Sequence, residues 1–138
     1  VFLQMLALAF GEISDFPFVQ PPDSRKINDG GSLIEELAAI EKQENKVVLT
    51  KAGRLLAKFP TDPRLSKMIL SAIDLGCIEQ IFIIVSAVSI QDPRERPHEK
   101  QQAADEKHNR FKDKESDFIS LLNLWHYIQQ QQKALTNN

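Results

Sequence analysis

The sequence lacks the patterns on which most self-contained catalytic sites depend. None of its five glycines precedes a lysine, so the glycine-rich loop with a terminal lysine that cradles a nucleoside triphosphate is missing. No serine lies in a Gly-x-Ser-x-Gly elbow, the nucleophile motif of many hydrolases. The 138 residues therefore predict neither a catalytic centre nor a nucleotide site of their own.

Residues that commonly bind metals are few and scattered. Cys77 is the only cysteine, so no disulfide can form within the chain, and a single thiol in an apolar stretch fits a reducing cytoplasm. The histidines, His98, His108 and His126, match no His-x-x-x-His zinc pair. We expect no metal and no cofactor in these residues.

The chain also has no excess of positive charge and no long apolar run. Its 17 Lys and Arg residues face 19 Asp and Glu residues, so strong binding to nucleic acid by the chain alone is not predicted. Residues 1–10 are apolar but too short to span a membrane, and they lack the basic flank of a secretory signal. We expect no membrane partner, and we interpret this segment as a helix cut near its start from a longer chain.

What the sequence does contain is the composition of a globular protein, with 42% hydrophobic and 26% charged residues. The apolar run at residues 2–10, closed by Gly11, predicts a first helix. Asp23 and Ser24 can cap a second helix that reaches about Ile40.

The next segment predicts a small β element. Val47–Leu49 is rich in β-branched residues and has polar flanks, which indicates a short strand that pairs with residues near Ile40. Thr50 then caps a short helix that contains Phe59. Helix, helix, strand and helix is the order of a winged-helix module, which we predict over residues 1–59.

The remaining residues, 60–138, predict a helical bundle. Asp62 suits an N-cap, Pro63 suits the first helical position, and Gly76 ends that helix. Residues 78–90 are the most apolar segment and predict a helix buried on nearly all sides, although their β-branched run would also permit a strand.

Two further helices are predicted after residue 97. A charged, solvated helix lies within residues 98–115, with Ala103, Ala104 and Phe111 facing inward. The last helix begins at Ser116 or Asp117 and carries an apolar stripe at helical spacing: Phe118, Leu121, Leu122, Trp125 and Ile128. We expect Trp125 in the core, although a tryptophan can also stack on a nucleic-acid base.

Residues 92–117 hold the candidate functional side chains, with 7 basic and 8 acidic residues. They form either a solvated helix surface or an RNA path along which Arg94, Arg96, Lys100 and Arg110 face the RNA while the acids face away. Asp105–His108 looks like a degenerate Asp-Glu-Ala-His motif. It follows a polar helical segment instead of a buried strand, so we interpret it as helix surface.

Several segments together resemble the helicase-associated region of DEAH-box RNA helicases. Leu49–Leu70 follows the family pattern Leu-Thr-x-x-Gly, then Pro-x-x-Pro-x-Leu-x-Lys-Met-Leu. Gln91–His108 is similar to the bacterial branch, as is Ser116–Phe118, where many other members read Gly-Asp-His. Supporting matches lie along the rest of the chain: Leu3–Leu6, Phe16–Pro22, Ile84–Ile90 and Arg96–Pro97.

This resemblance implies a mainly α fold, in which a winged-helix module with a small β-hairpin precedes the first part of a ratchet-like helical bundle. It also implies a non-catalytic accessory role in an ATP-dependent 3′-to-5′ RNA helicase, where the chain helps to form the RNA channel and couples RecA-domain motion to translocation. ATP and Mg²⁺ would bind the RecA-like domains of the longer chain. The implied partners are RNA, bound weakly by this segment alone, and the RecA-like and OB-fold domains of the same polypeptide.

Two other interpretations remain open. A free winged-helix regulator of DNA requires a basic recognition helix, and the candidate, Lys51–Phe59, carries three cations: Lys51, Arg54 and Lys58. A pure protein-interaction module would use exposed apolar surface. A gel shift tests the first, and concentration-dependent association without RNA affinity favours the second.

Overall fold

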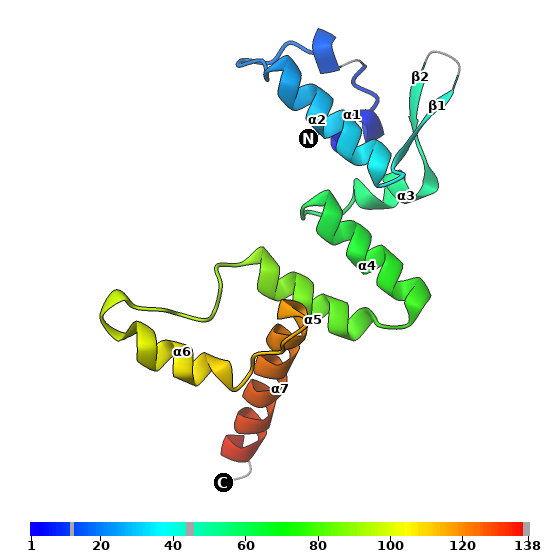
Figure 1. Ribbon diagram of the computed structural model, residues 1–138. Helices are drawn as coiled ribbons and strands as arrows, with labels where there is room; N and C mark the ends of the chain where they lie inside the picture. The colour runs from blue at the N-terminus through cyan, green and yellow to red at the C-terminus, as the bar shows by residue number, and fades with distance from the viewer. Residues whose placement is uncertain (12, 44–45, 137–138) are drawn as a thin grey trace. The chain divides into compact units, whose positions relative to one another are not determined.

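The computed structural model describes residues 1–11, 13–43 and 46–136. It is mainly helical, with one two-stranded antiparallel sheet among these residues, which confirms the predicted fold class (Figure 1). Contacts divide the chain into two compact units, Val1–Met68 and Ile69–Asn138. The predicted boundary between residues 59 and 60 lies nearer the N-terminus than this division, and as a boundary between modules it stays a prediction.

The first unit begins with helix α1 (Phe2–Ala7), the 3-10 turn η1 (Ile13–Asp15) and helix α2 (Ser24–Glu36). The Asp23 carboxylate caps α2 by accepting a hydrogen bond from the backbone amide of Arg25. Both helices end three or four residues before their predicted ends at residues 10 and 40. The chain reverses at Ala9 and Ala38, whose positive φ angles of 55° and 53° stop each helix without a glycine.

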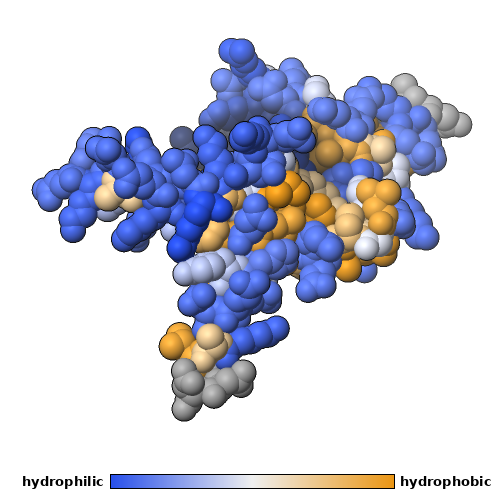
Figure 2. Space-filling view, turned by 60° about the horizontal axis from the view of Figure 1, so that its bottom comes forward, coloured by the Kyte–Doolittle hydropathy of each residue, from blue (hydrophilic) through white to orange (hydrophobic). Residues whose placement is uncertain are grey.

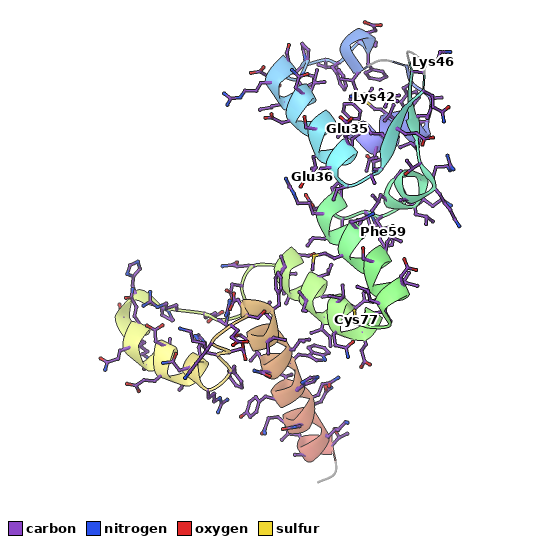
Figure 3. All side chains as sticks on the ribbon, turned by 45° about the vertical axis from the view of Figure 1, so that its right-hand side comes forward. Glu35, Glu36, Lys42, Lys46, Phe59 and Cys77 are labelled. Carbon is purple, nitrogen blue, oxygen red and sulfur yellow. The ribbon has the colours of Figure 1, made fainter. Side chains whose placement is uncertain are left out.

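A β-hairpin follows, formed by β1 (Ile40–Gln43) and β2 (Lys46–Leu49). Ile40 pairs with Leu49, as expected for a strand that pairs with residues near Ile40. Lys42 reaches across to Glu35 with an Nζ–Oε1 distance of 3.0 Å, which ties the hairpin to the end of α2 (Figure 3). Both side chains are more than half exposed, so this ion pair contributes little stability.

Helix α3 (Lys51–Leu56) packs closely against the segment between α2 and β1. The Thr50 hydroxyl donates to the carbonyl of Ala38 and accepts from the amide of Gly53, which confirms the predicted cap. Gly53 lies directly against the Ala39 carbonyl, where a Cβ would overlap the oxygen. The apolar core of this unit is made by six buried residues: Leu3, Met5, Ile34, Ala39, Ile40 and Leu56.

Helix α4 (Pro63–Leu75) runs across the division between the units. The Asp62 carboxylate accepts from the amide of Arg64, and Gly76 follows the helix with a φ of 68°, so both predicted ends are confirmed. Ser66 is fully buried on α4 and is satisfied by the Thr61 hydroxyl and the Asp62 carbonyl.

The second unit continues with helix α5 (Ile78–Ser89), the turn η2 (His98–Lys100), helix α6 (Gln101–Asn109) and helix α7 (Asp117–Thr136). The helical interpretation of residues 78–90 is therefore confirmed over the strand. Helices α5 and α7 pack on each other, with Ile84, Val85 and Leu121 buried. No described helix combines the length and apolar character that crossing a membrane requires.

Burial in this unit is lower than the sequence predicts. On α5, Phe82 and Val88 are 50% and 46% exposed, so a helix buried on nearly all sides is wrong for this chain. On the predicted α7 stripe Leu121 is buried, but Phe118, Trp125 and Ile128 are 42–47% exposed. Ala103 is also exposed, while Ala104 and Phe111 are half-buried. Apolar spacing identifies the inner face of a helix, but only packed neighbours can cover it.

Candidate nucleic-acid interface

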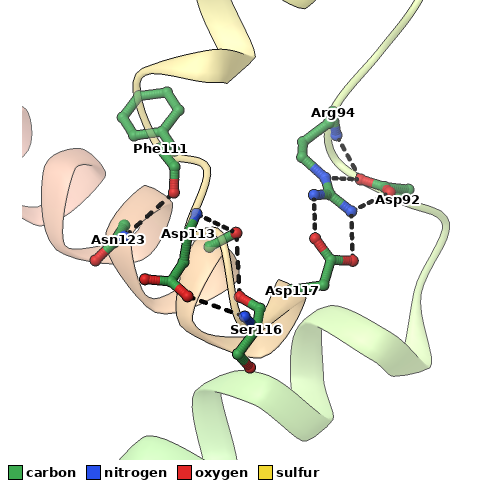
Figure 4. Close-up of polar contacts among 8 residues, drawn as sticks. Asp92, Arg94, Phe111, Asp113, Ser116, Asp117 and Asn123 are labelled. Atoms are coloured by element: carbon green, nitrogen blue, oxygen red, sulfur yellow. Dashed lines mark hydrogen bonds and ion pairs between the residues drawn. The ribbon is translucent and has the colours of Figure 1, made fainter.

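Arg94 lies in the loop after α5 and holds two carboxylates at once (Figure 4). Its Nε and Nη2 donate to Asp92 at 2.9 and 2.7 Å, and its Nη1 donates to Asp117 at 2.8 Å. Asp117 is the first residue of α7, so this arginine joins the loop to the start of that helix. The Arg94 side chain is 26% exposed, the least of the residues in these ion pairs.

The ion pairs shift the pKa of each partner toward its charged form. Hydrogen bonds from the Arg94 side chain lower the pKa of Asp92 from 3.8 to about 2, although burial opposes the shift. The same side chain lowers the pKa of Asp117. Hydrogen bonds to Asp92 and then to Asp117 raise the pKa of Arg94. At neutral pH the cluster carries one positive and two negative charges, so Arg94 presents no net positive charge there.

Arg96 forms a second, separate pair with Asp105. Its Nε and Nη2 donate to the two carboxylate oxygens at 2.7 and 2.8 Å, the parallel geometry in which a guanidinium binds carboxylates and phosphates. Hydrogen bonding to Arg96 lowers the pKa of Asp105. Asp105 lies on α6, so the lookalike motif Asp105–His108 is on a helix and its first carboxylate has a structural partner.

Arg110, at the C-terminal end of α6, has a different environment. Its guanidinium carbon lies 4.5 Å from the ring centroid of Phe111 and 4.3 Å from that of Tyr127 on α7. The two rings contact each other at 5.2 Å between centroids. A guanidinium over aromatic faces is held by cation–π attraction without losing its charge. Within the described part of the chain, Arg110 makes no ion pair and no side-chain hydrogen bond.

Lys100 is the N-cap residue of α6 and is exposed. Its backbone amide donates to the carbonyl of Pro97, but its ammonium has no ion pair among residues 1–11, 13–43 and 46–136. A lysine at a helix N-terminus does not favour the helix dipole, so the helix gains nothing from its charge. The ammonium is therefore available to an outside partner.

The four predicted RNA-facing cations differ in whether they have a carboxylate partner. Arg94 and Arg96 are bound to acids of the same chain, whereas Lys100 and Arg110 are bound to no acid among the residues that the structure describes. Asp92, Asp105 and Asp117 each contact one of these arginines, so the acids and the basic residues are not on separate surfaces. Whether the acids face away from RNA stays a prediction. Whether any of the four cations contacts RNA stays a prediction.

A polar network positions the loop between α6 and α7 (Figure 4). The backbone amide of Asp113 donates to the buried Ser120 hydroxyl at 2.9 Å, and the Asp113 carboxylate accepts from the amide of Ser116. One turn further along α7, the Asn123 side chain donates to the carbonyl of Phe111. These bonds fix the backbone next to Arg110. They could not be predicted from the sequence, in which the residues involved are ordinary polar side chains.

An apolar groove between α5 and α7 is the feature that sequence reasoning missed. It has a volume of about 500 Å³ and is walled mainly by Phe82 and Ile90 from the α5 side and by Trp125 and Ile128 from α7. Exposed hydrophobic surface is visible on the face shown in Figure 2. Trp125 therefore lines a groove and is not a core residue, which corrects the expectation for it.

Metal-binding clusters of histidine, cysteine, aspartate and glutamate are absent from the residues that the structure describes. Cys77 is a half-buried free thiol just before α5 (Figure 3). The chemistry that these side chains offer is charge pairing, hydrogen bonding and stacking.

Comparison with known proteins shows similarity to RNA helicases along the whole chain. Residues 62–121 match the family model of the helicase associated domain (HA2), ratchet-like. The chain is 59% identical, over its full length, to an ATP-dependent RNA helicase HrpA homolog of Haemophilus influenzae, and 56% identical to the ATP-dependent RNA helicase HrpA of Escherichia coli. It is 32% identical over 89% of its length to the pre-mRNA-splicing factor ATP-dependent RNA helicase prp22 of Schizosaccharomyces pombe.

The chain spans only 10–11% of the length of these relatives. The matched family segment begins at Asp62, which caps α4, and ends at Leu121 on α7. The similarity to both HrpA proteins agrees with the expected bacterial branch. The resemblance is therefore confirmed: the chain corresponds to the helicase-associated region of HrpA- and Prp22-like DEAH-box RNA helicases.

Proposed function

We propose that this chain is a non-catalytic accessory module of an ATP-dependent 3′-to-5′ RNA helicase. The observation that carries the proposal is the match of the entire chain, at 56–59% identity, to a segment of HrpA-type helicases. In this role the module helps to form the RNA channel and couples the motion of the RecA-like domains to RNA translocation. The relatives are about nine times longer than the chain, so the motor lies in other parts of such a protein.

The described side chains support a mechanical role more than a chemical one. Arg94 and the Asp113–Ser120 network fix the start of α7, so that α7 moves together with the loops before it. A rigid unit of this kind transmits displacement, because a packed core deforms little under load. Lys100 and Arg110, which form no ion pair with any described residue, supply a modest attraction for a polyanion.

The same proposal assigns the partners and cofactors. ATP and Mg²⁺ bind the RecA-like domains of the longer protein, and this module itself uses no cofactor. RNA binds weakly to the module alone, because its net charge is −2, and the RecA-like and OB-fold domains of the same polypeptide complete the channel. The free thiol of Cys77 is consistent with a cytoplasmic location.

The test neutralises the four candidate cations together in the full-length protein that carries this chain, as Arg94→Gln, Arg96→Gln, Lys100→Gln and Arg110→Gln. We expect RNA-stimulated ATP hydrolysis to need a several-fold higher RNA concentration for half-maximal stimulation, with ATP hydrolysis in the absence of RNA unchanged. Wild-type RNA affinity and stimulation in this variant would show that the RNA-facing side is assigned wrongly.

A matched control removes the same charge from the first unit at four exposed lysines: Lys26, Lys46, Lys51 and Lys58. We expect this control to retain wild-type stimulation by RNA. If the control loses nucleic-acid binding and the test variant does not, the winged-helix interpretation, in which α3 reads nucleic acid, is favoured instead.

A further inference from the structure

We propose that, of the three candidate arginines, Arg110, held over the rings of Phe111 and Tyr127, is the one that binds a backbone phosphate of single-stranded RNA, whereas Arg94 and Arg96 are structural. This inference rests on the proposed function and names its contact residue. The sequence alone does not distinguish these three arginines, whereas their contacts in the structure do.

The guanidinium groups of the three arginines differ in how many of their donors are already bound to carboxylates. Arg94 uses Nε, Nη1 and Nη2 for two carboxylates, and Arg96 uses Nε and Nη2 for one. A phosphate that bound either arginine would have to displace a carboxylate in the same bidentate geometry. That exchange replaces one charge-assisted pair with another, so its net gain is small.

Arg110 has no such competitor among the described residues. Its guanidinium lies over two aromatic rings, and none of its five N–H groups bonds a carboxylate among the described residues. The full positive charge and all five donors are therefore available to an anion. A phosphate oxygen pair matches this fork, and the ring faces that Arg110 covers are closed to a stacking base.

Arg110 is also preorganised for binding. A free arginine loses considerable rotamer freedom when it binds, at a cost of up to about 2 kcal/mol. Arg110 is already confined by two rings at 4.5 and 4.3 Å. Phe111 is itself anchored to α7 by the Asn123 hydrogen bond at 3.2 Å and by the contact of its ring with Tyr127. Part of the ordering cost is therefore met in the free protein.

Arg110 also differs from Arg94 in its local charge. Within four residues of Arg110 in the sequence lie three lysines, Lys107, Lys112 and Lys114, and two acids, Glu106 and Asp113. None of the three lysines has an ion pair in the part of the chain that the structure describes. The nearest acid in sequence, Asp113, accepts hydrogen bonds from the backbone amides of Glu115 and Ser116 and pairs with no lysine. A segment of this composition attracts a polyanion, in contrast to the compensated Arg94 cluster.

The test measures binding of a fluorescent single-stranded oligouridylate to the full-length protein by anisotropy, over a series of salt concentrations. We expect Arg110→Gln to weaken binding several-fold at low salt. Loss of one phosphate contact should reduce the slope of log affinity against log salt by about 0.7. Arg110→Lys keeps the charge but loses the fork, so it should preserve the slope and bind less tightly than wild type.

Arg96→Gln is the matched control, since it removes the same charge from an arginine on the same segment. We expect it to leave the salt slope unchanged. A wild-type slope in Arg110→Gln, or an equal loss of slope in Arg96→Gln, would overturn the inference. Absence of RNA binding by the wild-type protein would instead overturn the proposed function on which the inference depends.

Discussion

Gly53 allows α3 to pack against the backbone segment between α2 and β1. Its backbone lies against the carbonyl of Ala39, the last residue before β1 in the segment that joins α2 to the hairpin. That carbonyl also accepts from the amide of Thr50, so it cannot turn away without loss of a hydrogen bond. Any side chain at position 53 therefore has to displace backbone.

We predict that Gly53→Ala lowers the free energy of unfolding by about 1–3 kcal/mol or more, the cost of overpacking a closed site. Urea denaturation followed by circular dichroism measures this change. The control is Gly30→Ala on α2, where a Cβ would meet only the Phe2 ring at an ordinary 3.9 Å. That variant should be as stable as wild type or gain up to about 1 kcal/mol from better helix propensity. Equal stability of the two alanine variants would contradict the described packing.

Residue-scale rules also explain which features the sequence could predict. Thr50, Asp62, Pro63 and Gly76 were identified correctly, because caps and helix stops depend on groups a few residues away. The pairing of Arg94 with Asp117 was not predictable, since these residues are 23 positions apart and their meeting depends on the packing of α7 against α5.

At the scale of elements, Arg94 joins the loop after α5 to the beginning of α7. Its hydrogen bonds depress the pKa of Asp92 to about 2. A carboxyl whose pKa is lowered in the folded state adds stability above its ordinary pKa and loses that contribution as the pH falls through its folded pKa. The contribution of Asp92 is therefore present above about pH 4 and disappears toward pH 2.

We predict that the melting temperature of the wild-type chain falls between pH 4 and pH 2 by more than that of Asp92→Asn, which lacks this titration. Thermal melts in low salt, followed by circular dichroism, provide the comparison. The expected difference is small, because the Asp92 side chain is 54% exposed and the pair is screened by solvent. Asp29→Asn removes an exposed α2 carboxylate with no described ion pair and should keep the wild-type decrease. Identical acid profiles for all three proteins would contradict the role given to Arg94.

Helix ends and burial mark the limits of prediction at this scale. The helices α1 and α2 end early because Ala9 and Ala38 adopt positive φ, a conformation that alanine rarely takes. Local backbone hydrogen bonds close both helix ends there: the amides of Ala9 and Phe10 donate to α1 carbonyls, and those of Ala38 and Ala39 donate to α2 carbonyls. The sequence correctly predicts that α5 and α7 each pack inward, since Ile84, Val85 and Leu121 are buried. Their burial was overestimated, because Phe82, Trp125 and Ile128 have no covering element among the residues described.

At the scale of the whole molecule, the fold class and the family could be predicted from sequence, and the candidate site only in part. The motif Leu49–Leu70 spans the end of the hairpin, all of α3 and the first part of α4. Its residues therefore include helix caps, close backbone contacts and core positions. Such positions are specific when taken together. The candidate RNA-facing residues are surface arginines, and the sequence does not show which of them already has a carboxylate partner.

In the proposed function this chain is an accessory module, and the ATP-hydrolysing motor lies elsewhere in a longer helicase. The most direct measurement is ATP hydrolysis with and without single-stranded RNA, by the purified 138-residue chain and by the full-length protein that carries it. We expect no turnover of ATP by the chain alone and RNA-stimulated turnover by the full-length protein. ATP hydrolysis by the isolated chain, or a full-length protein whose hydrolysis does not respond to RNA, would contradict the proposed function.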